Sequence, residues 1–378
     1  MKFTIKNFKC FIDTQIPMNL LTVLTGVNGA GKSSFIQSIL LFRQLVDLAK
    51  DVPKEYIPDN SVSLNGQYLL ALGDGSCILP NNVNDDNISF AFVNDKTNIN
   101  LCYAQFVVKN NTTPTLALSV ISEKSMVNNQ ECPICRQAFY YLNAERLGPR
   151  IRQELKYFSY PHAGWQGEYT AQLLNLESGF YKIDESRKFP NSQNPLLLTS
   201  QINDWLDFLI PETSISVTSN PETLEAQIRI ENAFTRQIPA LATNMGFGIS
   251  YVLPILATGL IAEAGTMFLV ENPEAHLHPS AQTRIGMFLA MVAQAGVHVV
   301  VETHSDHVIN GIQLAVVKQT IQHELVTVNF FEQIKKSEQP KITPIALSEK
   351  GELECWPPGF FDQSQRDLAE LFNARRSL

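Results

Sequence analysis

The pattern of hydrophobic and polar positions changes twice along the chain. Residues 3–9 alternate apolar and polar side chains and predict a strand, whereas residues 20–25 form a continuous apolar run and predict a buried strand. Residues 35–50 place large apolar side chains on one face and predict a helix. From about 61 to 123 the chain shows short alternating runs separated by Asn, Asp, Gly and Pro clusters. This segment predicts an antiparallel β layer.

The second half of the chain returns to alternating strands and helices. Residues 139–142, 266–270 and 297–301 are apolar and predict strands, with helices expected after residue 246, up to about 295 and again after 306. Polar residues follow each of these strands, which is typical of a parallel sheet whose carboxyl ends form a site. Between them, about 160–235 predicts a lobe of helices and one hairpin, and residues 363–375 predict a short helix.

A glycine-rich loop joins the buried strand at 20–25 to the helix that follows. The residues from Gly26 to Ser33 have the form G-x-x-x-x-G-K-S, a pattern whose backbone N–H groups surround phosphates at a helix start. Lys32 is expected to reach the β- and γ-phosphates, and Ser33 to bind Mg²⁺. The predicted nucleotide-binding residues of this loop are Gly26, Asn28, Gly29, Ala30, Gly31, Lys32, Ser33 and Ser34.

Composition indicates where the protein works and does not identify its partner. The net charge of −8 gives no global basic surface, so any nucleic acid has to meet a local patch or a partner subunit. No signal peptide and no apolar run of membrane-spanning length is evident, and the six cysteines suit reduced thiols better than a disulfide framework. We therefore expect a cytoplasmic protein that does not enter a membrane.

Two strand ends carry the remaining candidate chemistry. Glu271 ends one apolar strand. In a phosphate-loop protein a carboxylate at such a place commonly is the second residue that holds Mg²⁺. His304 follows the next strand and is expected to contact the γ-phosphate or the attacking water. ATP and Mg²⁺ are thus the expected cofactors.

The motifs together resemble a known class of ATPase. The first strand, the phosphate loop, the segment 244–250, the stretch ENPEAHLHP and the stretch ETHSD are similar to the head of ABC/SMC-like ATPases of the RecF and overcoming-lysogenization-defect type. More narrowly, NAERLGPR, GEY, NMGFGIS, ETHSDH and WPPGFFDQ resemble bacterial AAA-type ATPases that end in a small domain of unknown function. The resemblance implies an α/β fold, namely an ABC-type P-loop head with a mixed or parallel core sheet, an antiparallel layer and a helical lobe.

The resemblance also implies a shared site. Asn244, Gly246 and Gly248 take the place of the ABC signature, which would touch the γ-phosphate held by a second protomer, so that a homodimer forms two composite ATP sites. His278 takes the place of the D-loop aspartate, and His304 that of the switch histidine. Asn272 departs from the family pattern, because it lies where a catalytic carboxylate is usual and an amide cannot accept the proton of water. Glu274 and Glu302 are the candidate substitutes for that base.

Weaker signals leave alternatives open. Arg146 is expected to bind nucleotide, although Arg146, Arg150, Arg152 and Lys156 form a cluster that suits nucleic-acid phosphate or salt bridges as well. Cys132 and Cys135 form a single CxxC without a second pair, and a structural role is favoured over a zinc site, as it is for His276 and His278. Residues 356–361 are apolar and predict a core plug or a docking surface.

These observations predict a head at 1–320, with the β insertion at about 61–123 and the helical and hairpin lobe at about 160–235, followed by a small C-terminal domain at 321–378. The expected function is a slowly hydrolysing ATPase switch that dimerises on ATP and controls a partner effector, such as a nuclease or toxin encoded nearby. Anti-phage defence is implied only by the resemblance. The alternative is a RecF-like repair or recombination ATPase that clamps DNA directly.

Overall fold

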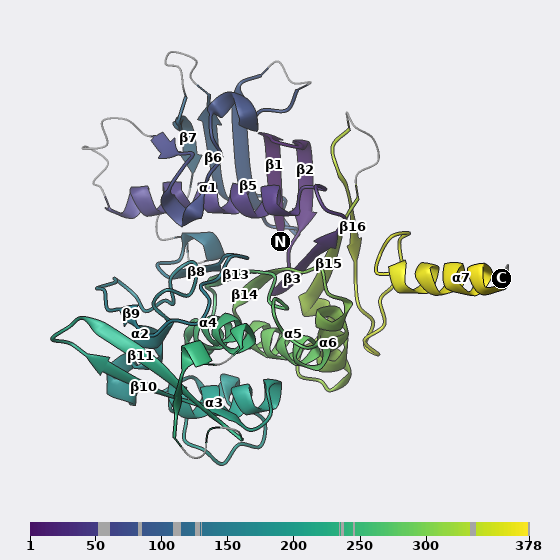
Figure 1. Cartoon of the computed structure of the whole chain (residues 1–378). Coiled ribbons are helices and arrows are strands. Elements are labelled where there is room, and N and C mark those ends of the chain that lie inside the picture. Colours follow the sequence, from purple (N-terminus) through teal and green to yellow (C-terminus); the bar gives the residue numbers. More distant parts are fainter. Residues whose placement is uncertain are drawn as a thin grey trace.

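Two six-stranded sheets and a smaller lobe make up the protein, with one long helix between the sheets (Figure 1). The computed structural model describes residues 1–51, 61–81, 85–108, 115–124, 129, 131–233, 235, 238–244, 246–332 and 338–376. This arrangement confirms the predicted α/β class, with a mostly parallel core sheet and an antiparallel layer.

The core sheet is mostly parallel and carries the predicted strand ends. Its order is β16-β15-β3-β14-β13-β8, with parallel pairing from β15 through β8 and an antiparallel β16 at one edge. The strands are β3 (Leu21–Gly26), β8 (Phe139–Leu142), β13 (Met267–Glu271), β14 (His298–Glu302), β15 (Val326–Glu332) and β16 (Lys341–Ile345). Phe268, Leu269 and Val299 are fully buried, as continuous apolar strands covered on both faces should be.

Helices α4 (Phe247–Ile261), α5 (Pro279–Gln294) and α6 (Asp306–Val317) pack around the core sheet (Figure 1). Helices α5 and α6 approach closely through two glycines. A Cβ atom at Gly311 would lie 1.9 Å from the Thr283 carbonyl oxygen, so only glycine permits this crossing. The helices that follow β13 and β14 are therefore fixed against each other.

The antiparallel sheet has the order β2-β1-β5-β6-β7-β4, so the first two strands of the chain join the predicted insertion. Its strands are β1 (Lys2–Phe8), β2 (Phe11–Pro17), β4 (Ser61–Ser63), β5 (Asn87–Val93), β6 (Asn100–Val107) and β7 (Ala117–Lys124). Helix α1 (Lys32–Asp51) buries Phe35 and Phe42 against Phe3 and Phe90 of this sheet, and it also contacts the core sheet through Phe331. The helix after the phosphate loop is thus fixed by both sheets.

The lobe predicted at about 160–235 contains the expected helix and hairpin. Its elements are β9 (Gln153–Glu154), α2 (Thr170–Leu174), α3 (Leu198–Leu209), β10 (Thr213–Asn220), β11 (Glu225–Asn232) and β12 (Ala240–Leu241). The Trp205 ring of α3 meets Phe288 of α5 edge-on, with ring centroids 5.0 Å apart. This contact attaches the lobe to the core helices.

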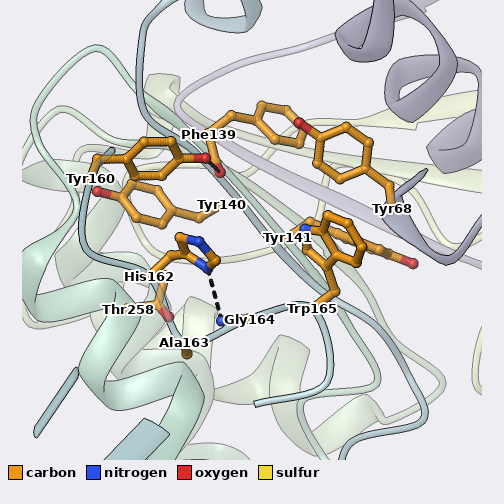
Figure 2. Close-up of a pocket in the computed structure, with 10 residues that line it drawn as sticks. All are labelled: Tyr68, Phe139, Tyr140, Tyr141, Tyr160, His162, Ala163, Gly164, Trp165 and Thr258. Atoms are coloured by element: carbon orange, nitrogen blue, oxygen red, sulfur yellow. Dashed lines mark hydrogen bonds between the residues drawn. The ribbon is translucent and has the colours of Figure 1, made fainter. Parts of the chain in front are cut away.

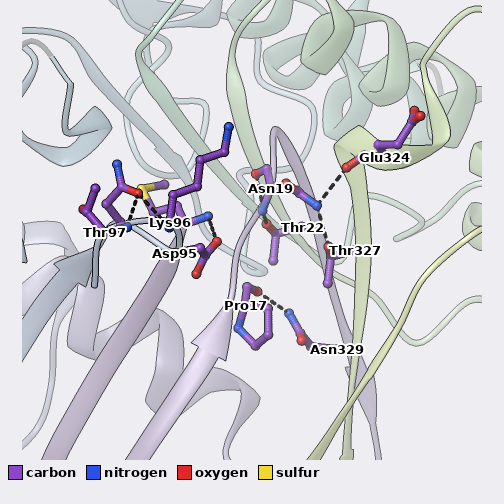
Figure 3. A network of polar contacts seen from close by, with 11 residues as sticks. Pro17, Asn19, Thr22, Asp95, Lys96, Thr97, Glu324, Thr327 and Asn329 are labelled. Carbon is purple, nitrogen blue, oxygen red and sulfur yellow. Dashed lines mark hydrogen bonds and ion pairs between the residues drawn. The ribbon is translucent and has the colours of Figure 1, made fainter. Parts of the chain in front are cut away.

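Strand β15 is anchored to the N-terminal part of the head. The Asn19 Nδ2 atom donates to Thr327 Oγ1 at 2.8 Å, and the Asn329 Nδ2 atom donates to the Pro17 carbonyl at 2.9 Å (Figure 3). Strand β15 pairs with the phosphate-loop strand β3, and β16 pairs with β15. Both strands thus belong to the core sheet, although they follow residue 320. The division of the chain at residue 320 stays a prediction.

The end of the described chain projects from the head as α7 (Gln363–Arg376), which lies beyond β16 (Figure 1). Within residues 356–361, Phe360 is buried against Phe330, whereas Trp356 is 62% exposed, so this segment is partly core and partly surface. No helix in the described part of the chain is both long and apolar enough to cross a membrane.

Candidate nucleotide site

The phosphate loop has the backbone conformation that its glycines predict. Gly26, Gly29 and Gly31 have φ values of 135°, 75° and 100°, which side chains of L residues rarely adopt. A Cβ atom at Gly26 would lie 2.1 Å from the carbonyl oxygen of Phe331, so neighbouring strand β15 shapes the loop as well. Asn28, Gly29 and Ser33 are exposed, which leaves this loop and the first N–H groups of α1 open to a ligand.

Lys32 folds back onto the loop. Its Nζ atom donates to the carbonyl oxygens of Gly26 and Val27, both at 2.9 Å, and the residue is only 4% exposed. Burial lowers the pKa of its ammonium group, while the nearby Glu302 opposes that change. A phosphate group placed in the loop would offer this buried cation a stronger acceptor than two neutral carbonyls.

Two glutamates lie side by side where β13 and β14 end. Glu271 and Glu302 are register partners on neighbouring parallel strands, and the charge of Glu271 acts on the carboxyl group of Glu302. Burial raises the pKa of both, that of Glu302 to about 8, where the negative charge of Glu271 adds to the effect of burial. Such a pair is electrostatically costly when ionised, so an adjacent divalent cation would stabilise it. Oxygen ligands from Glu271 and Ser33 suit Mg²⁺, and this donor set fits the predicted metal.

Tyr141 positions the Glu271 carboxylate. Its hydroxyl donates to Glu271 Oε1 at 2.6 Å and accepts from Asn143 Nδ2 at 2.8 Å. Tyr141 lies in β8 and Asn143 in the turn after it, and β8 is the strand next to β13 in the sheet. Tyr141 was not among the predicted site residues, because a tyrosine within the apolar run 139–142 indicates core packing and no contact with a distant carboxylate.

Asn272 lies in the turn after β13 with a φ of 44°, a left-handed conformation that Asn adopts more readily than most residues. Its N–H donates to the Glu302 carbonyl at 2.9 Å, which ties the turn to β14. Arg146 fixes the same turn, because its Nη1 donates to the Glu271 carbonyl at 2.7 Å and its Nη2 to the Asn272 carbonyl at 2.6 Å. The Arg146 guanidinium is 3% exposed, and burial lowers its pKa to about 10.

The contacts of Arg146 point to a different role from the predicted one. Its donors hold carbonyl oxygens of the β13 turn and of Asn143, and it lies over the Tyr251 ring at 5.2 Å. Phosphate binding by Arg146 stays a prediction, and the geometry favours a positioning role. Arg150 and Arg152 are exposed, and Arg152 is paired to Glu225 at 2.8 Å. The predicted basic cluster is therefore divided between a buried Arg146, which holds a turn, and exposed arginines at the surface.

Glu274 links the turns after β13 and β14. Its Oε1 accepts from the His304 N–H at 2.8 Å, and its Oε2 accepts from Thr303 Oγ1 at 2.9 Å. His304 itself is exposed, and burial of part of its ring together with Lys32 lowers the pKa of its imidazole. Glu274 therefore holds the backbone of the predicted switch histidine with one oxygen and the side chain of the preceding Thr303 with the other.

The segment predicted to face a second protomer lies at the start of α4. Asn244 and Gly246 are exposed, Met245 lies outside the described residues, and Gly246 is the N-cap of α4 without a side-chain cap. Gly248 serves a contact within the chain, because a Cβ atom there would lie 2.8 Å from the His276 carbonyl oxygen. The α4 N-terminus thus offers free N–H groups at the surface while Gly248 brings it close to the turn after β13.

The histidines of that turn have structural contacts. The His276 ring packs on Tyr251 with centroids 4.6 Å apart, and His278 caps α5 by accepting from the Ser280 N–H. These contacts agree with the structural role favoured over metal binding.

A separate cavity of about 90 Å³ lies beside β8, lined by aromatic residues that include Tyr68, Tyr141 and Trp165 (Figure 2). His162 faces it, and its Nδ1 accepts from the Gly164 N–H at 3.0 Å. Burial lowers the pKa of His162 to about 4, so this ring is neutral near pH 7. None of the predicted nucleotide-binding residues lines this cavity. The buried hydroxyl of Thr258 has no hydrogen-bond partner among the described residues, which makes the cavity suited to water.

Three families match successive parts of the chain. Residues 2–131 match a family described as "AAA domain", and residues 138–310 match one described as "AAA domain, putative AbiEii toxin, Type IV TA system". Residues 321–371 match a family described as "Protein of unknown function (DUF3696)". A comparison with curated proteins found no match.

Solved structures share the fold across nearly the whole chain. An SMC head bound to the C-winged helix domain of ScpA is 13% identical with a TM-score of 0.55, covering 92% of this chain and 98% of that one. An SMC head with an extended coiled coil, bound to the C-terminal domain of ScpA derived from Pyrococcus furiosus, is 12% identical with a TM-score of 0.53 and 98% coverage of both chains. At these identities the likeness establishes the fold alone.

Proposed function

We propose that this chain, an AAA ATPase of the ABC and SMC type, binds ATP with Mg²⁺, hydrolyses it slowly and acts as a switch. The observation that carries the proposal is the combination of a phosphate loop of the expected conformation with Asn272 at the position of the usual base. Lys32 and the N-terminus of α1 bind the phosphates, while Ser33 and Glu271 hold the metal. Mg²⁺ neutralises charge on the β- and γ-phosphates when bound.

Slow hydrolysis follows from the contacts of the residues around the attacking water. The amide of Asn272 orients water and cannot take its proton, and Glu274 uses both oxygens to hold Thr303 and His304. Glu302, buried beside Glu271, is the remaining carboxyl group at these strand ends. Phosphoryl transfer still proceeds, because positioning and charge neutralisation supply most of its acceleration.

The switch is proposed to work through a dimer. The exposed start of α4, with Asn244 and Gly246, would complete the site of a second protomer at its γ-phosphate. Because ATP would bind the closed dimer preferentially, it would favour that state over the monomer.

The controlled partner is proposed to be a protein effector, such as a nuclease or toxin, in an anti-phage defence setting. Two findings support this part of the proposal. The family matched by residues 138–310 carries a toxin description, and the similar SMC heads are described as bound to a protein, ScpA. Direct clamping of duplex DNA by the isolated protein is the competing outcome.

The test is the solution mass with ATP–Mg²⁺ and without it, measured by light scattering. We expect doubling with ATP in the native protein, and loss of that doubling in Gly246→Asp, whose carboxylate would face the γ-phosphate. Gly246→Ala is the matched control, since a Cβ atom at Gly246 meets nothing within 4 Å and its φ of −66° suits any residue. An ATP-bound native monomer would exclude the shared site, and ATP-dependent doubling of Gly246→Asp would exclude the role of this segment.

The biological role needs a second measurement. Salt-dependent binding of plain duplex DNA by the isolated protein would favour the clamp over the effector switch. Co-purification with the product of a neighbouring gene, lost in the absence of ATP, would support the switch.

A further inference from the structure

Three cysteines from distant parts of the sequence meet between the antiparallel sheet and the start of β8. Cys102 lies in β6, Cys132 is the N-cap of a 3₁₀ turn that precedes β8, and Cys135 is the last residue of that turn. Their sulfur atoms all lie within 4.8 Å of one another, and the Sγ atoms of Cys102 and Cys132 are 2.7 Å apart. Cys102 and Cys132 are 0% exposed and Cys135 is 3% exposed.

The single CxxC in the sequence is thus completed by a third thiol. Cys132 and Cys135 form one CxxC without a second pair, and the nearest histidine along the chain is His162, so a structural role was the prediction for these two cysteines. His162 instead faces the aromatic cavity, while Cys102 reaches the pair from 30 residues upstream of Cys132. None of the six cysteines, all of which lie within the described residues, forms a disulfide, and Cys10, Cys77 and Cys355 lie outside this cluster.

We propose that Cys102, Cys132 and Cys135 bind one thiophilic cation, Zn²⁺ or Cu⁺, through three thiolates at a site separate from the nucleotide. Three sulfurs bound to one ion at about 2.3 Å lie about 3.8 Å apart, a spacing within the range that these side chains span. Thiolate sulfur is the ligand that selects Cu⁺ and Zn²⁺ over the oxygen-seeking Mg²⁺.

The local backbone suits such a site. The Cys135 N–H donates to the Cys132 carbonyl at 3.0 Å, and the resulting tight turn brings both sulfurs to one side, as C-x₂-C ligand pairs do. No His, Asp or Glu of the described residues joins the group. Cu⁺ would accept three sulfurs alone, and Zn²⁺ would add one ligand that the protein does not supply.

A buried cation lies beside this turn. Arg43 of α1 donates through Nη1 to the carbonyls of Ile134 at 2.8 Å and Arg136 at 2.6 Å, and through Nη2 to that of Gln137 at 2.8 Å. Its guanidinium charge, shared with Asp47, would offset part of the negative charge of three thiolates around one ion. The bound ion would join β6 to the turn that leads into β8 and Tyr141, while Arg43 joins the same turn to α1.

A disulfide between Cys102 and Cys132 is the competing use of the closest pair. Both thiols are fully buried, so oxidants reach them slowly. Metal binding would remove the thiol protons and compensate the charge in the same step.

The test begins with the metal content of the full-length protein purified with a reductant. Separate samples are incubated with Zn²⁺ and with Cu⁺, desalted and analysed by mass spectrometry of the elements. We expect one equivalent of one of these ions in the native protein, its loss in Cys132→Ser, and its retention in Cys77→Ser, a matched change at an exposed cysteine. No stoichiometric ion in either arm, or full retention by Cys132→Ser, would overturn the proposal.

A second measurement does not depend on the folding of a variant. Thiols of the native protein are labelled with a maleimide in buffer without denaturant, with and without a strong chelator of soft metals. A bound ion should slow the labelling of three thiols until the chelator is added, and Co²⁺ bound in its place should give a sulfur-to-cobalt charge-transfer band. A protein lighter by two hydrogen atoms before reduction, with no cobalt band, would show a disulfide and contradict the site.

Discussion

The ends of β3 and β13 lie in one sheet, separated by β14, and they hold their polar groups in different ways. After β3, Lys32 donates to two carbonyls of its own exposed loop, and a phosphate could replace those acceptors. After β13, Glu271 is held by Tyr141 and Glu274 by the next turn, through contacts between strands. The comparison indicates that nucleotide binding and hydrolysis depend on separable parts of the site.

The sharpest way to test this difference is to supply the carboxylate that the β13 turn lacks. Asn272→Glu should raise ATP turnover by about 10²–10⁴-fold, the usual contribution of a positioned base. Glu is less suited than Asn to the φ of 44° at this position, at a cost of about 1–2 kcal/mol in stability. Asn272→Gln is the control, because it has the same length and strain without the carboxylate. Brisk native turnover that neither change alters would place the base elsewhere.

Removing the charge of Lys32 should weaken the binding of ATP more than it changes the hydrolysis step. Lys32→Ala should weaken ATP binding by about 10²-fold or more, since a charge-assisted contact to phosphate is lost in a buried setting. Titration with fluorescent ATP measures the effect, and Lys6→Ala is the control because Lys6 forms an exposed pair with Asp13. Unchanged affinity in Lys32→Ala would remove the phosphate-loop assignment.

A smaller effect is expected from loosening the link between the two turns. Glu274→Gln replaces an oxygen that accepts from Thr303 or His304 with an NH₂ group, so turnover should fall about tenfold and the melting temperature should drop. Glu349→Gln, an exposed change, serves as the control. If Glu274→Gln also removed the acidic limb of the pH–rate profile while leaving stability intact, Glu274 would be the base and not a positioning residue.

The last prediction concerns the carboxyl pair, whose effect on stability is spread over several pH units. The folded-state pKa of Glu302 is raised to about 8 from an ordinary value of 4.5, so its stabilising contribution is present below pH 4.5 and is lost as the pH rises toward 8. Without Mg²⁺, stability should therefore fall across this window by at most about 1.4 kcal/mol per pH unit. Thermal melts at several pH values measure this slope. Glu302→Gln or added Mg²⁺ should flatten it, and an equal slope in Glu302→Gln would contradict the assignment.

The sequence predicted the core strands well and missed some edge elements. Strand β8 was predicted with its observed bounds, and β13 and β14 within one residue. Strand β2 was missed because Lys9, with a φ of 53°, turns the chain without a glycine or an Asn-Gly pair. Strand β16 contains Pro344, which argues against a central strand but is tolerated at the sheet edge where β16 lies.

The sequence by itself determined the phosphate loop and its partner strand ends. The loop could be predicted because Gly26, Gly31 and Lys32 lie within seven consecutive residues, and the conformational freedom of glycine and the charge of lysine follow from residue type alone. For the same reason the apolar runs before Glu271 and Glu302 marked these residues as strand ends.

Only the tertiary structure decided what several of these side chains contact. Arg146 reaches the carbonyls of a turn 125 residues away, Tyr141 meets Glu271 130 residues away, and Cys102 joins Cys132 across 30 residues. Such contacts depend on which strands become neighbours, and spacing along the chain carries no information about that. Because these groups are buried, losing one of these contacts should cost more stability than losing a contact at the surface, since a buried charge or polar group without a partner is costly.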